Sequence, residues 1–208
     1  MTLTNKQISK KYNRFSLFYD FIERPIEKKL FSKWRKELLK EVKGRVLEIG
    51  VGTGKNFPYY NHEKVDLTAI DISKGMLNKA KKKANDLGLK VKLELTNTDY
   101  LPFKDDSFDY VIATFVLCSV PDQKKMLLEI KRVVKNSGNI FLLDHVLSKN
   151  KLIAFFQNIH NPFTKFLLGV NVNRDTIGSI KKTGLKIVKE KNLALKDVFK
   201  ETKVKKWD

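Results

Sequence analysis

Apolar and polar positions along the chain alternate in a way that predicts short buried strands separated by amphipathic helices. The predicted strands cover residues 45–49, 65–70, 90–95, a run around Val111, 139–143, 185–190 and 198–204. The predicted helices between them cover residues 76–87, 124–134 and 177–183. Strands that alternate with helices favour a mostly parallel sheet with helices on both faces. A length of 208 residues, without repeats or an interdomain linker, predicts one compact domain.

The first 44 residues have a helical pattern of their own. Phe15, Phe18, Tyr19 and Ile22 lie on one stripe of a helix over residues 8–24. Pro25 then suits the first turn of a second helix. The apolar face expected for this second helix consists of Ile26, Leu30, Phe31, Trp34 and Leu38, and its solvent face of Lys28, Lys29, Arg35 and Lys36. These aromatic residues either pack onto the main domain or form a cap over a ligand crevice, so we predict a helical segment over residues 1–44 and a main domain over residues 45–208.

A glycine-rich turn after the first strand is the first candidate for ligand binding. Its pattern is Glu48-x-Gly50-x-Gly52-x-Gly54, whereas a dinucleotide-binding loop would need glycine at the position of Lys55. Glycines at such a turn allow positive φ and close approach of a ligand. A carboxylate beside them disfavours a pyrophosphate and favours a cationic or hydroxyl-rich ligand. NAD(H) is therefore not expected here, and a plain tight turn is the alternative.

Two further acidic residues lie at the ends of predicted strands. Asp71 follows the second strand, 17 residues beyond Gly54, and Asp99 follows the third. Ser73 is expected to cap the helix after Asp71. The inward face expected for that helix, which closes at Gly88, consists of Met76, Leu77, Ala80, Ala84 and Leu87. Each acid alone could cap a loop, but two acids at strand ends favour a ligand site.

The glycine pattern and the two acids together resemble the class I S-adenosylmethionine-dependent methyltransferases. The resemblance implies a Rossmann-like, seven-stranded, mostly parallel sheet whose last strand is antiparallel. It also implies S-adenosylmethionine as cofactor, S-adenosylhomocysteine as its product, and no metal. The cofactor-binding residues implied are Glu48, Gly50, Gly52, Gly54, Asp71, Ile72, Met76, Thr98, Asp99, Tyr100 and Thr114.

Three more stretches resemble particular members of this family. Residues 101–112 match the pattern L-P-F-x-D-x-S-F-D-x-V of small-molecule methyltransferases, and the run around Cys118 resembles the methyltransferase-like alkyl-thiol S-methyltransferases. A Tyr-x-x-Phe-x-x-x-Tyr-Asp segment that ends at Asp20 resembles the cap of quinone and lipid methyltransferases, which implies a role for Tyr19. His145 stands where related enzymes often carry a histidine, and it is either a base or a structural residue. We interpret Cys118 as a packed apolar residue, because methyl transfer needs no nucleophilic cysteine.

The charge distribution adds a question about partners. The net charge of +19 is divided as +7 in residues 1–44, +3 in residues 45–144 and +9 in residues 145–208. Three interpretations remain open: a nucleic-acid surface, an anionic membrane surface or a solvated lysine coat. The scarcity of arginine disfavours nucleic acid. One cysteine and no long apolar stretch predict a cytoplasmic protein, possible contact with a membrane surface included.

We therefore expect methyl transfer by direct displacement to a small, partly apolar acceptor such as a thiol, a quinol or an aminolipid. The Phe-rich residues 148–172 are expected to close the acceptor pocket. An RNA-directed methyltransferase and a non-catalytic module that binds S-adenosylmethionine are the alternatives. The Asn-Pro-Pro-Tyr type of motif is absent at residues 113–116, which disfavours methylation of base amines.

Overall fold

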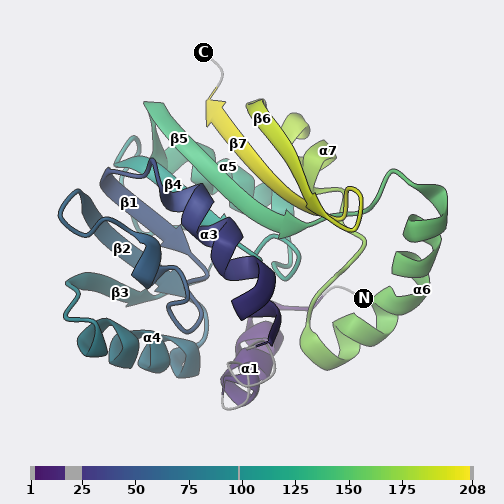
Figure 1. Cartoon of the computed structure of the whole chain (residues 1–208), viewed down its shortest axis with the longest axis horizontal. Coiled ribbons are helices and arrows are strands. Elements are labelled where there is room, and N and C mark those ends of the chain that lie inside the picture. The colour runs from purple at the N-terminus through teal and green to yellow at the C-terminus, as the bar shows by residue number, and fades with distance from the viewer. Residues whose placement is uncertain (1–2, 17–24, 98, 207–208) are drawn as a thin grey trace.

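The sheet at the centre of the molecule has the predicted topology. In the computed structural model, residues 3–16, 25–97 and 99–206 are described, and in them seven strands form one sheet in the order β3-β2-β1-β4-β5-β7-β6 (Figure 1). The strands are β1 Gly44–Ile49, β2 Val65–Asp71, β3 Val91–Leu95, β4 Phe108–Thr114, β5 Val134–His145, β6 Leu185–Ala194 and β7 Phe199–Lys206. Strands β1 to β5 pair in parallel, and β7 runs antiparallel to both β5 and β6. The predicted Rossmann-like fold class is confirmed.

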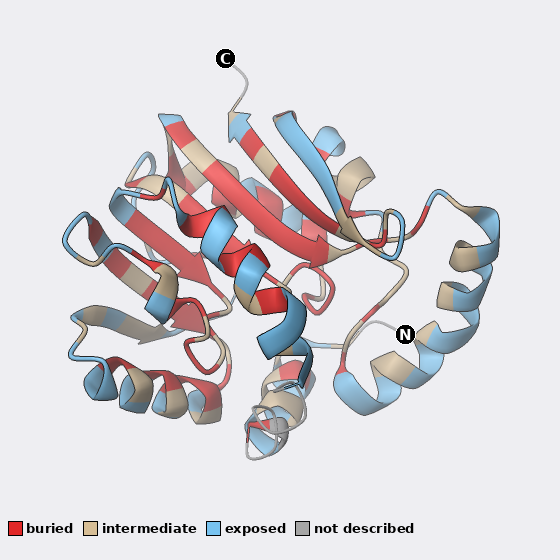
Figure 2. Ribbon diagram, in the orientation of Figure 1, coloured by how far each residue is buried: buried red, intermediate tan, exposed pale blue. Residues whose placement is uncertain are grey.

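Helices cover both faces of the sheet. They are α1 Asn5–Phe15, the π-helical segment η1 Glu27–Phe31, α3 Ser32–Leu39, the 3₁₀ turn η2 Phe57–Tyr59, α4 Lys74–Asp86, α5 Gln123–Val133, α6 Lys151–Leu168 and α7 Thr176–Lys182. Helices α3 and α4 share one apolar cluster, which includes Leu38, Ala80 and Phe141. Helices α5 and α7 share the other, with Ile130 and Ile180. The buried strands between these two clusters form the core (Figure 2).

Helix α4 is positioned by the residues that begin and end it. The Ser73 hydroxyl accepts a hydrogen bond from the Met76 backbone N–H, which confirms the predicted cap. Gly88 follows the helix with a φ of +65°, a conformation that glycine adopts without strain. The inward face is buried as predicted except for Leu87, which is 45% exposed. That prediction is wrong because the helix ends at Asp86, so Leu87 no longer follows the helical stripe.

The N-terminal helices differ from the expectation in several ways. Helix α1 ends at Phe15, and the remainder of the predicted stripe, Tyr19 included, lies outside the described residues. In the second helix Phe31 and Leu38 are buried as predicted, whereas Ile26 and Leu30 are exposed. Arg35 was predicted to face solvent but is only 4% exposed. The π-helical segment η1 directly precedes α3. The Arg35 guanidinium points inward, where it donates to the buried Asn56 side chain.

Strand β5 is longer than the sequence indicates. It begins at Val134 rather than at residue 139, and Val134 pairs with Phe108 across a register shift in β4. A Cβ at Gly138 would lie 3.0 Å from the Asp109 carbonyl oxygen, so glycine permits the close approach of the two strands at this point. At the other end of β5, Asp144 and His145 reach the edge of the sheet where the parallel strands end, as predicted.

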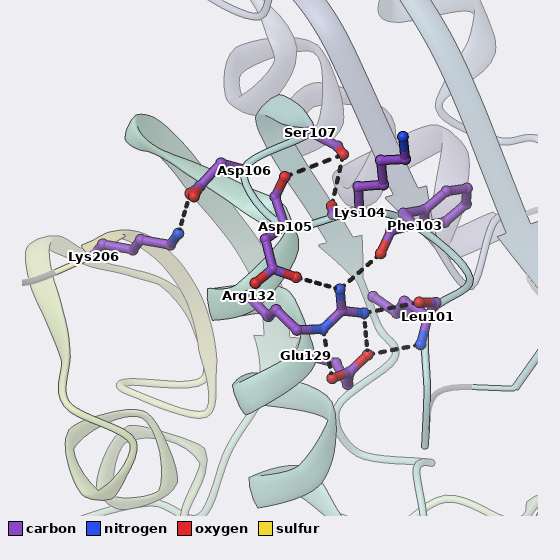
Figure 3. Close-up of polar contacts among 9 residues, drawn as sticks. All are labelled: Leu101, Phe103, Lys104, Asp105, Asp106, Ser107, Glu129, Arg132 and Lys206. Carbon is purple, nitrogen blue, oxygen red and sulfur yellow. Dashed lines mark hydrogen bonds and ion pairs between the residues drawn. The ribbon is translucent and has the colours of Figure 1, made fainter.

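The loop between β3 and β4 is held in place by Arg132 of α5 (Figure 3). The guanidinium donates to the carbonyl oxygens of Leu101 and Phe103 at 2.8 and 2.7 Å. It also bonds the carboxylates of Glu129 and Asp105 at 2.6 and 2.9 Å. One cation therefore fixes the L-P-F-x-D segment against the last turn of α5.

Candidate functional site

A cleft lies at the carboxyl ends of β1, β2 and β4, where the glycine-rich turn follows β1. Parallel strands end at the same edge of a sheet, so residues far apart in the sequence meet there. The cleft is lined by Asn5, Ile8, Tyr12, Ile49, Gly50, Gly52, Ile70, Asp71, Ile72, Met76, Thr96, Thr114, Phe115, Val116, Ser119, Val120 and Pro121. The lining combines the backbone of the turn and the Asp71 carboxylate with mostly apolar residues from α1 and the segment after β4.

The glycine-rich turn is built around backbone conformations that favour glycine. Gly50, Gly52 and Gly54 have φ values of +66°, +56° and +77°. A Cβ at Gly50 would lie 2.4 Å from Val116 Cγ2, and one at Gly54 would lie 2.6 Å from the Phe57 ring. A Cβ at Gly52 would meet no atom within 4 Å, so Gly52 faces the open cleft. Two glycines therefore serve packing, and the middle one leaves room for a ligand.

Asp71 connects the turn to the next helix. Its Oδ2 accepts a hydrogen bond from Gly52 N–H at 2.9 Å, and its Oδ1 accepts from Ser73 N–H at 2.8 Å. Burial raises the pKa of this carboxyl above its usual value, although the backbone donors oppose the rise. Among the described residues no cationic side chain bonds to this buried carboxylate at the cleft wall, which suits a ligand that brings hydroxyl donors or a positive charge.

A polar network lies behind the cleft floor and joins four elements. Asn56 donates to Glu48 Oε1 at 2.9 Å, and Tyr60 donates to Glu48 Oε2 at 2.9 Å. Arg35 Nη1 donates to Asn56 Oδ1 at 2.9 Å and to Thr114 Oγ1 at 2.7 Å. Of these residues only Thr114 lines the cleft. The network thus lies behind the cleft lining and supports it. The helical pattern of the sequence, which predicted a solvent-exposed Arg35, gave no indication of this network.

Burial makes the Glu48 carboxyl an unusually weak acid. It raises the pKa of the Glu48 carboxyl from 4.5 to about 7, against the lowering effect of the Tyr60 and Asn56 hydrogen bonds. The folded protein therefore holds a proton on Glu48 that the unfolded chain has released above pH 4.5. The contribution of Glu48 to stability is greatest at low pH and is lost as pH rises through about 7.

We expect Glu48→Gln to remove this pH dependence. Between pH 5 and pH 8, the Glu48 contribution to the free energy of unfolding should fall by about 2–3 kcal/mol in the wild type, and the variant should not show that fall. Urea unfolding of both proteins at several pH values measures the difference. Parallel pH profiles for the two proteins would show that Glu48 titrates near its ordinary value.

Helix α1 borders the cleft and makes hydrogen bonds to two segments, residues 72–75 and Ser119. The Ser9 hydroxyl donates to the Ile72 carbonyl at 2.8 Å. Asn13 Oδ1 accepts from the Gly75 N–H at 2.8 Å and from the Ser73 hydroxyl at 2.7 Å. The hydroxyls of Tyr12 and Ser119 share a hydrogen bond of 2.7 Å across the cleft. Helix α1 also contributes Asn5, Ile8 and Tyr12 to the lining of the cleft, and the division of the chain into a cap and a main domain stays a prediction.

The apolar residues of the cleft continue into an aromatic cluster. Phe115 has a φ of +59°, which is uncommon for a large side chain and occurs where strand β4 ends at the cleft. Its ring centroid lies 4.5 Å from that of Phe31 and 6.4 Å from that of Phe199. The Arg35 guanidinium lies 5.2 Å from the Phe115 ring centroid. This part of the cleft can therefore contact an apolar group of a ligand. No sequence pattern predicted the aromatic cluster around Phe115.

The structure brings together only part of the predicted cofactor-binding set. The predicted residues that line the cleft are Gly50, Gly52, Asp71, Ile72, Met76 and Thr114. Glu48 and Gly54 lie behind the lining and support it. Asp99 is exposed and accepts a hydrogen bond from Asn5 Nδ2 at 2.6 Å, so α1 reaches it, and Tyr100 is 67% exposed. Thr98 lies outside the described residues, and the ligand roles of the whole set stay predictions.

His145 lies beside the cleft and is not among its lining residues. Its Nδ1 is 3.6 Å from Asp144 Oδ1, and its Nε2 is buried without a hydrogen-bond partner among the described residues. Potential ligand atoms of Cys118, Asp144 and His145 lie within 4.8 Å of one another. Burial, however, raises the pKa of the Cys118 thiol well above its usual value, which disfavours a thiolate ligand. The role of His145 as a base stays a prediction.

The donor set of the cleft fits the cofactor expected from the sequence. S-adenosylmethionine carries a sulfonium and an ammonium charge, ribose hydroxyls and a flat adenine ring. The buried Asp71 carboxylate can accept from hydroxyl donors, Gly52 leaves open space, and Ile72 and Met76 offer apolar contact. Nothing in this lining calls for a metal ion.

Comparison with known proteins agrees with this geometry. The family described as "Methyltransferase domain" matches residues 47–142. Phosphatidylethanolamine N-methyltransferase of Cereibacter sphaeroides is 37% identical over 124 residues, which is 55% of this chain and 61% of that protein, so the match spans less than two thirds of it. Demethylmenaquinone methyltransferase of Listeria welshimeri is 31% identical over 180 residues, 82% of this chain and 74% of that protein.

A solved structure extends the similarity to nearly the whole fold. The crystal structure of a SAM dependent methyltransferase from Aquifex aeolicus superposes with a TM-score of 0.61 at 21% identity and covers 97% of this chain and 98% of that chain. The sheet order, the glycine turn after β1 and the sequence relatives therefore converge. The chain belongs to the class I S-adenosylmethionine-dependent methyltransferases.

Proposed function

We propose that this methyltransferase acts on a small, partly apolar acceptor, a thiol, a quinol or an aminolipid, by direct in-line displacement. The observation that carries the proposal is the mixed lining of the cleft. The glycine turn and Asp71 contribute polar groups, and Phe115, Val116 and Val120 contribute apolar groups. A covered cleft of this kind can align a cofactor and an apolar acceptor next to each other.

The residues of the chain contribute mainly alignment and exclusion of water. When bound, S-adenosylmethionine supplies a methyl group on a sulfonium that an acceptor can attack directly. Asp71 and the backbone around Gly52 hold the polar part of the cofactor. Helix α1, through Ile8 and Tyr12, covers the cleft and keeps water from the reacting groups. A displacement in which positive charge is dispersed benefits from such desolvation.

The choice of acceptor is supported by the relatives and by the apolar residues of the cleft. The names of the two relatives refer to phosphatidylethanolamine and to demethylmenaquinone, both of which carry long apolar portions. Apolar contacts from Val120 and Pro121 suit such portions better than they suit a nucleic-acid backbone. The experiment is methyl transfer from labelled S-adenosylmethionine to a panel of thiols, quinols, aminolipids and RNA. We expect product from at least one of the first three classes and none from RNA. Methylated RNA alone would contradict the proposal.

A substitution among the apolar residues of the cleft tests how the acceptor is held. Val120→Thr keeps the shape of the side chain and replaces one methyl group by a hydroxyl at a position that is 5% exposed. We expect kcat/KM for the acceptor to fall about tenfold, because an unpaired buried hydroxyl costs about 1–3 kcal/mol. Affinity for S-adenosylhomocysteine should be unchanged. Val188→Thr, at an exposed position of β6, is the matched control, and equal kinetics of the two variants would place the acceptor elsewhere.

A further inference from the structure

Helix α6 is amphipathic in the opposite sense from an ordinary surface helix. Its 18 residues include none that is buried, although the helix is rich in phenylalanine. In Figure 1 it lies at the margin of the molecule, and in Figure 2 its surface is exposed or intermediate along its whole length. The exposed apolar residues of the helix are Leu152, Phe155, Phe156, Ile159, Phe163, Phe166, Leu167 and Leu168. Contiguous exposed apolar residues of this size mark a binding surface.

The spacing of these residues shows that they share one face. Leu152, Phe155, Phe156, Ile159, Phe163 and Phe166 recur at i, i+3, i+4, i+7, i+11 and i+14, which places them within one narrow stripe of a helix. Phe163 and Phe166 are 64% and 75% exposed, so the stripe faces outward. We name these six residues the α6 apolar face.

The polar side of α6 faces the protein. Gln157 Nε2 donates to the carbonyl oxygens of Val146 and Val172 at 2.9 and 2.7 Å, and its Oε1 accepts from Ser148 N–H at 2.8 Å. Asn161 Oδ1 accepts from Val172 N–H at 2.9 Å. These bonds tie the helix to the segments on either side of it. The outward direction of the α6 apolar face is therefore fixed by specific hydrogen bonds.

Basic residues predominate around the α6 apolar face, although the Asp197 carboxylate accepts from Ser148 Oγ and Lys149 N–H beside its first turn. Residues 145–174 include Lys149, Lys151, Lys165 and Arg174 and no aspartate or glutamate. Helix α1, likewise free of acids, carries Lys6, Lys10, Lys11 and Arg14. The two helices are in contact, because Lys11 Nζ donates to the Phe166 carbonyl oxygen and lies 5.5 Å from the Phe166 ring centroid. Lys11 thus joins the basic helix α1 to the end of the α6 apolar face.

We propose that the α6 apolar face inserts shallowly into an anionic lipid bilayer surface, with the basic residues of α1 and α6 beside the headgroups. Apolar residues on one face with a basic rim are the features of a helix that lies in the interface plane. Among the described residues, no helix is long and apolar enough to cross a membrane. A second copy of the chain fits less well, because pairing of two α6 apolar faces would bring two predominantly basic rims together.

The attachment of α6 gives this docking a consequence for the cleft. Beyond the end of α6, Asn171 N–H and Nδ2 both donate to the Cys118 carbonyl oxygen, at 2.9 and 3.1 Å. The next residues, Ser119 and Val120, line the cleft, and so does Tyr12 of α1. Docking of α6 therefore brings two walls of the cleft to the lipid surface. The docking itself does not depend on the proposed function, since it requires no cofactor and no acceptor.

Vesicle flotation of the full chain, without cofactor or acceptor, tests the proposal. The vesicles are pure phosphatidylcholine or phosphatidylcholine with 30% phosphatidylglycerol (about a third anionic lipid), at low and high salt. We expect at least tenfold stronger binding to the anionic vesicles at low salt, and weaker binding at high salt. Equal recovery with both vesicles, or no binding to either, would overturn the proposal whatever the enzyme methylates.

Two variants separate the apolar and the charged contributions. Phe155→Gln combined with Phe163→Gln should lower binding at least tenfold. Leu87→Gln combined with Leu128→Gln, at an exposed position directly after α4 and an exposed position of α5, should not. Lys6→Gln combined with Lys10→Gln should remove the preference for anionic lipid, whereas Lys124→Gln combined with Lys125→Gln on α5 should retain it. Circular dichroism confirms that each variant is folded.

Sedimentation velocity without lipid completes the test. A dimer that the double phenylalanine variant converts to a monomer would assign the α6 apolar face to a second copy and overturn the proposal.

Discussion

Replacing Arg35 by alanine should lower the free energy of unfolding by about 3–5 kcal/mol, the range for breaking a buried ionic network by removing one partner. Arg35 is 4% exposed, and its Nε also donates to Glu27 Oε1 at 3.1 Å. Without the guanidinium, the buried side chains of Asn56 and Thr114 each lose a donor. Urea unfolding measures the loss, and Lys36→Ala on the exposed side of α3 is the control.

The same substitution should also weaken cofactor binding, since Thr114 lines the cleft and is bonded to Arg35 at 2.7 Å. Arg35→Lys would keep the charge but could not bond two acceptors from one planar group. It should therefore recover only part of the lost stability. A variant Arg35→Ala that unfolds like the wild type would show that the buried network contributes little to the fold.

Replacing Asp71 by asparagine should reduce affinity for S-adenosylhomocysteine by about tenfold to a hundredfold, which corresponds to a loss of about 1–3 kcal/mol. The two carboxylate oxygens accept from Gly52 N–H and Ser73 N–H. An asparagine offers one acceptor and one donor, so one backbone N–H loses its partner and the turn loses its position. The ligand loses an acceptor at the same place. Calorimetry with S-adenosylhomocysteine measures the change.

Asp66→Asn is the matched control for Asp71→Asn, because Asp66 belongs to the same strand and is exposed. Its affinity for S-adenosylhomocysteine should equal that of the wild type. The absence of detectable binding to the wild type itself would contradict the cofactor assignment. Equal binding by both variants would show that the cofactor does not use the carboxylate at the end of β2.

Repeating local patterns made much of the fold predictable. A buried parallel strand has to be apolar, and a helix that covers a sheet has to repeat its apolar residues at helical spacing, so Ile49, Ile70 and Leu127 could be placed in the core from the sequence. Ser73 as a cap and Gly88 as a terminator follow from backbone chemistry that acts over a few residues. The seven-stranded, mostly parallel sheet with an antiparallel last strand followed from the resemblance to the family.

The sequence could not show which side chains leave their expected surroundings. Arg35 lies on a helix with lysines on either side of its stripe, and only the approach of Asn56 and Thr114 from other elements gives it buried acceptors. Phe115 forms part of the cleft because strand β4 ends in a left-handed conformation, and no spacing of residues predicts that. His145 lies beside the cleft because its neighbours Asp144 and Phe199 hold the ring there.

The sequence by itself determined the alternating architecture, the glycine turn with its nearby acids, and membership in a methyltransferase family, because these depend on local spacing and on backbone conformation. Only the tertiary structure decided which of the predicted cofactor-binding residues line the cleft, that α1 borders it, and that the apolar side of α6 faces outward. The spacing of apolar residues in α6 is that of any amphipathic helix. Its direction was decided by the hydrogen bonds of Gln157 and Asn161 to segments that the fold brings beside it, and contacts between distant segments leave no periodic trace in a sequence.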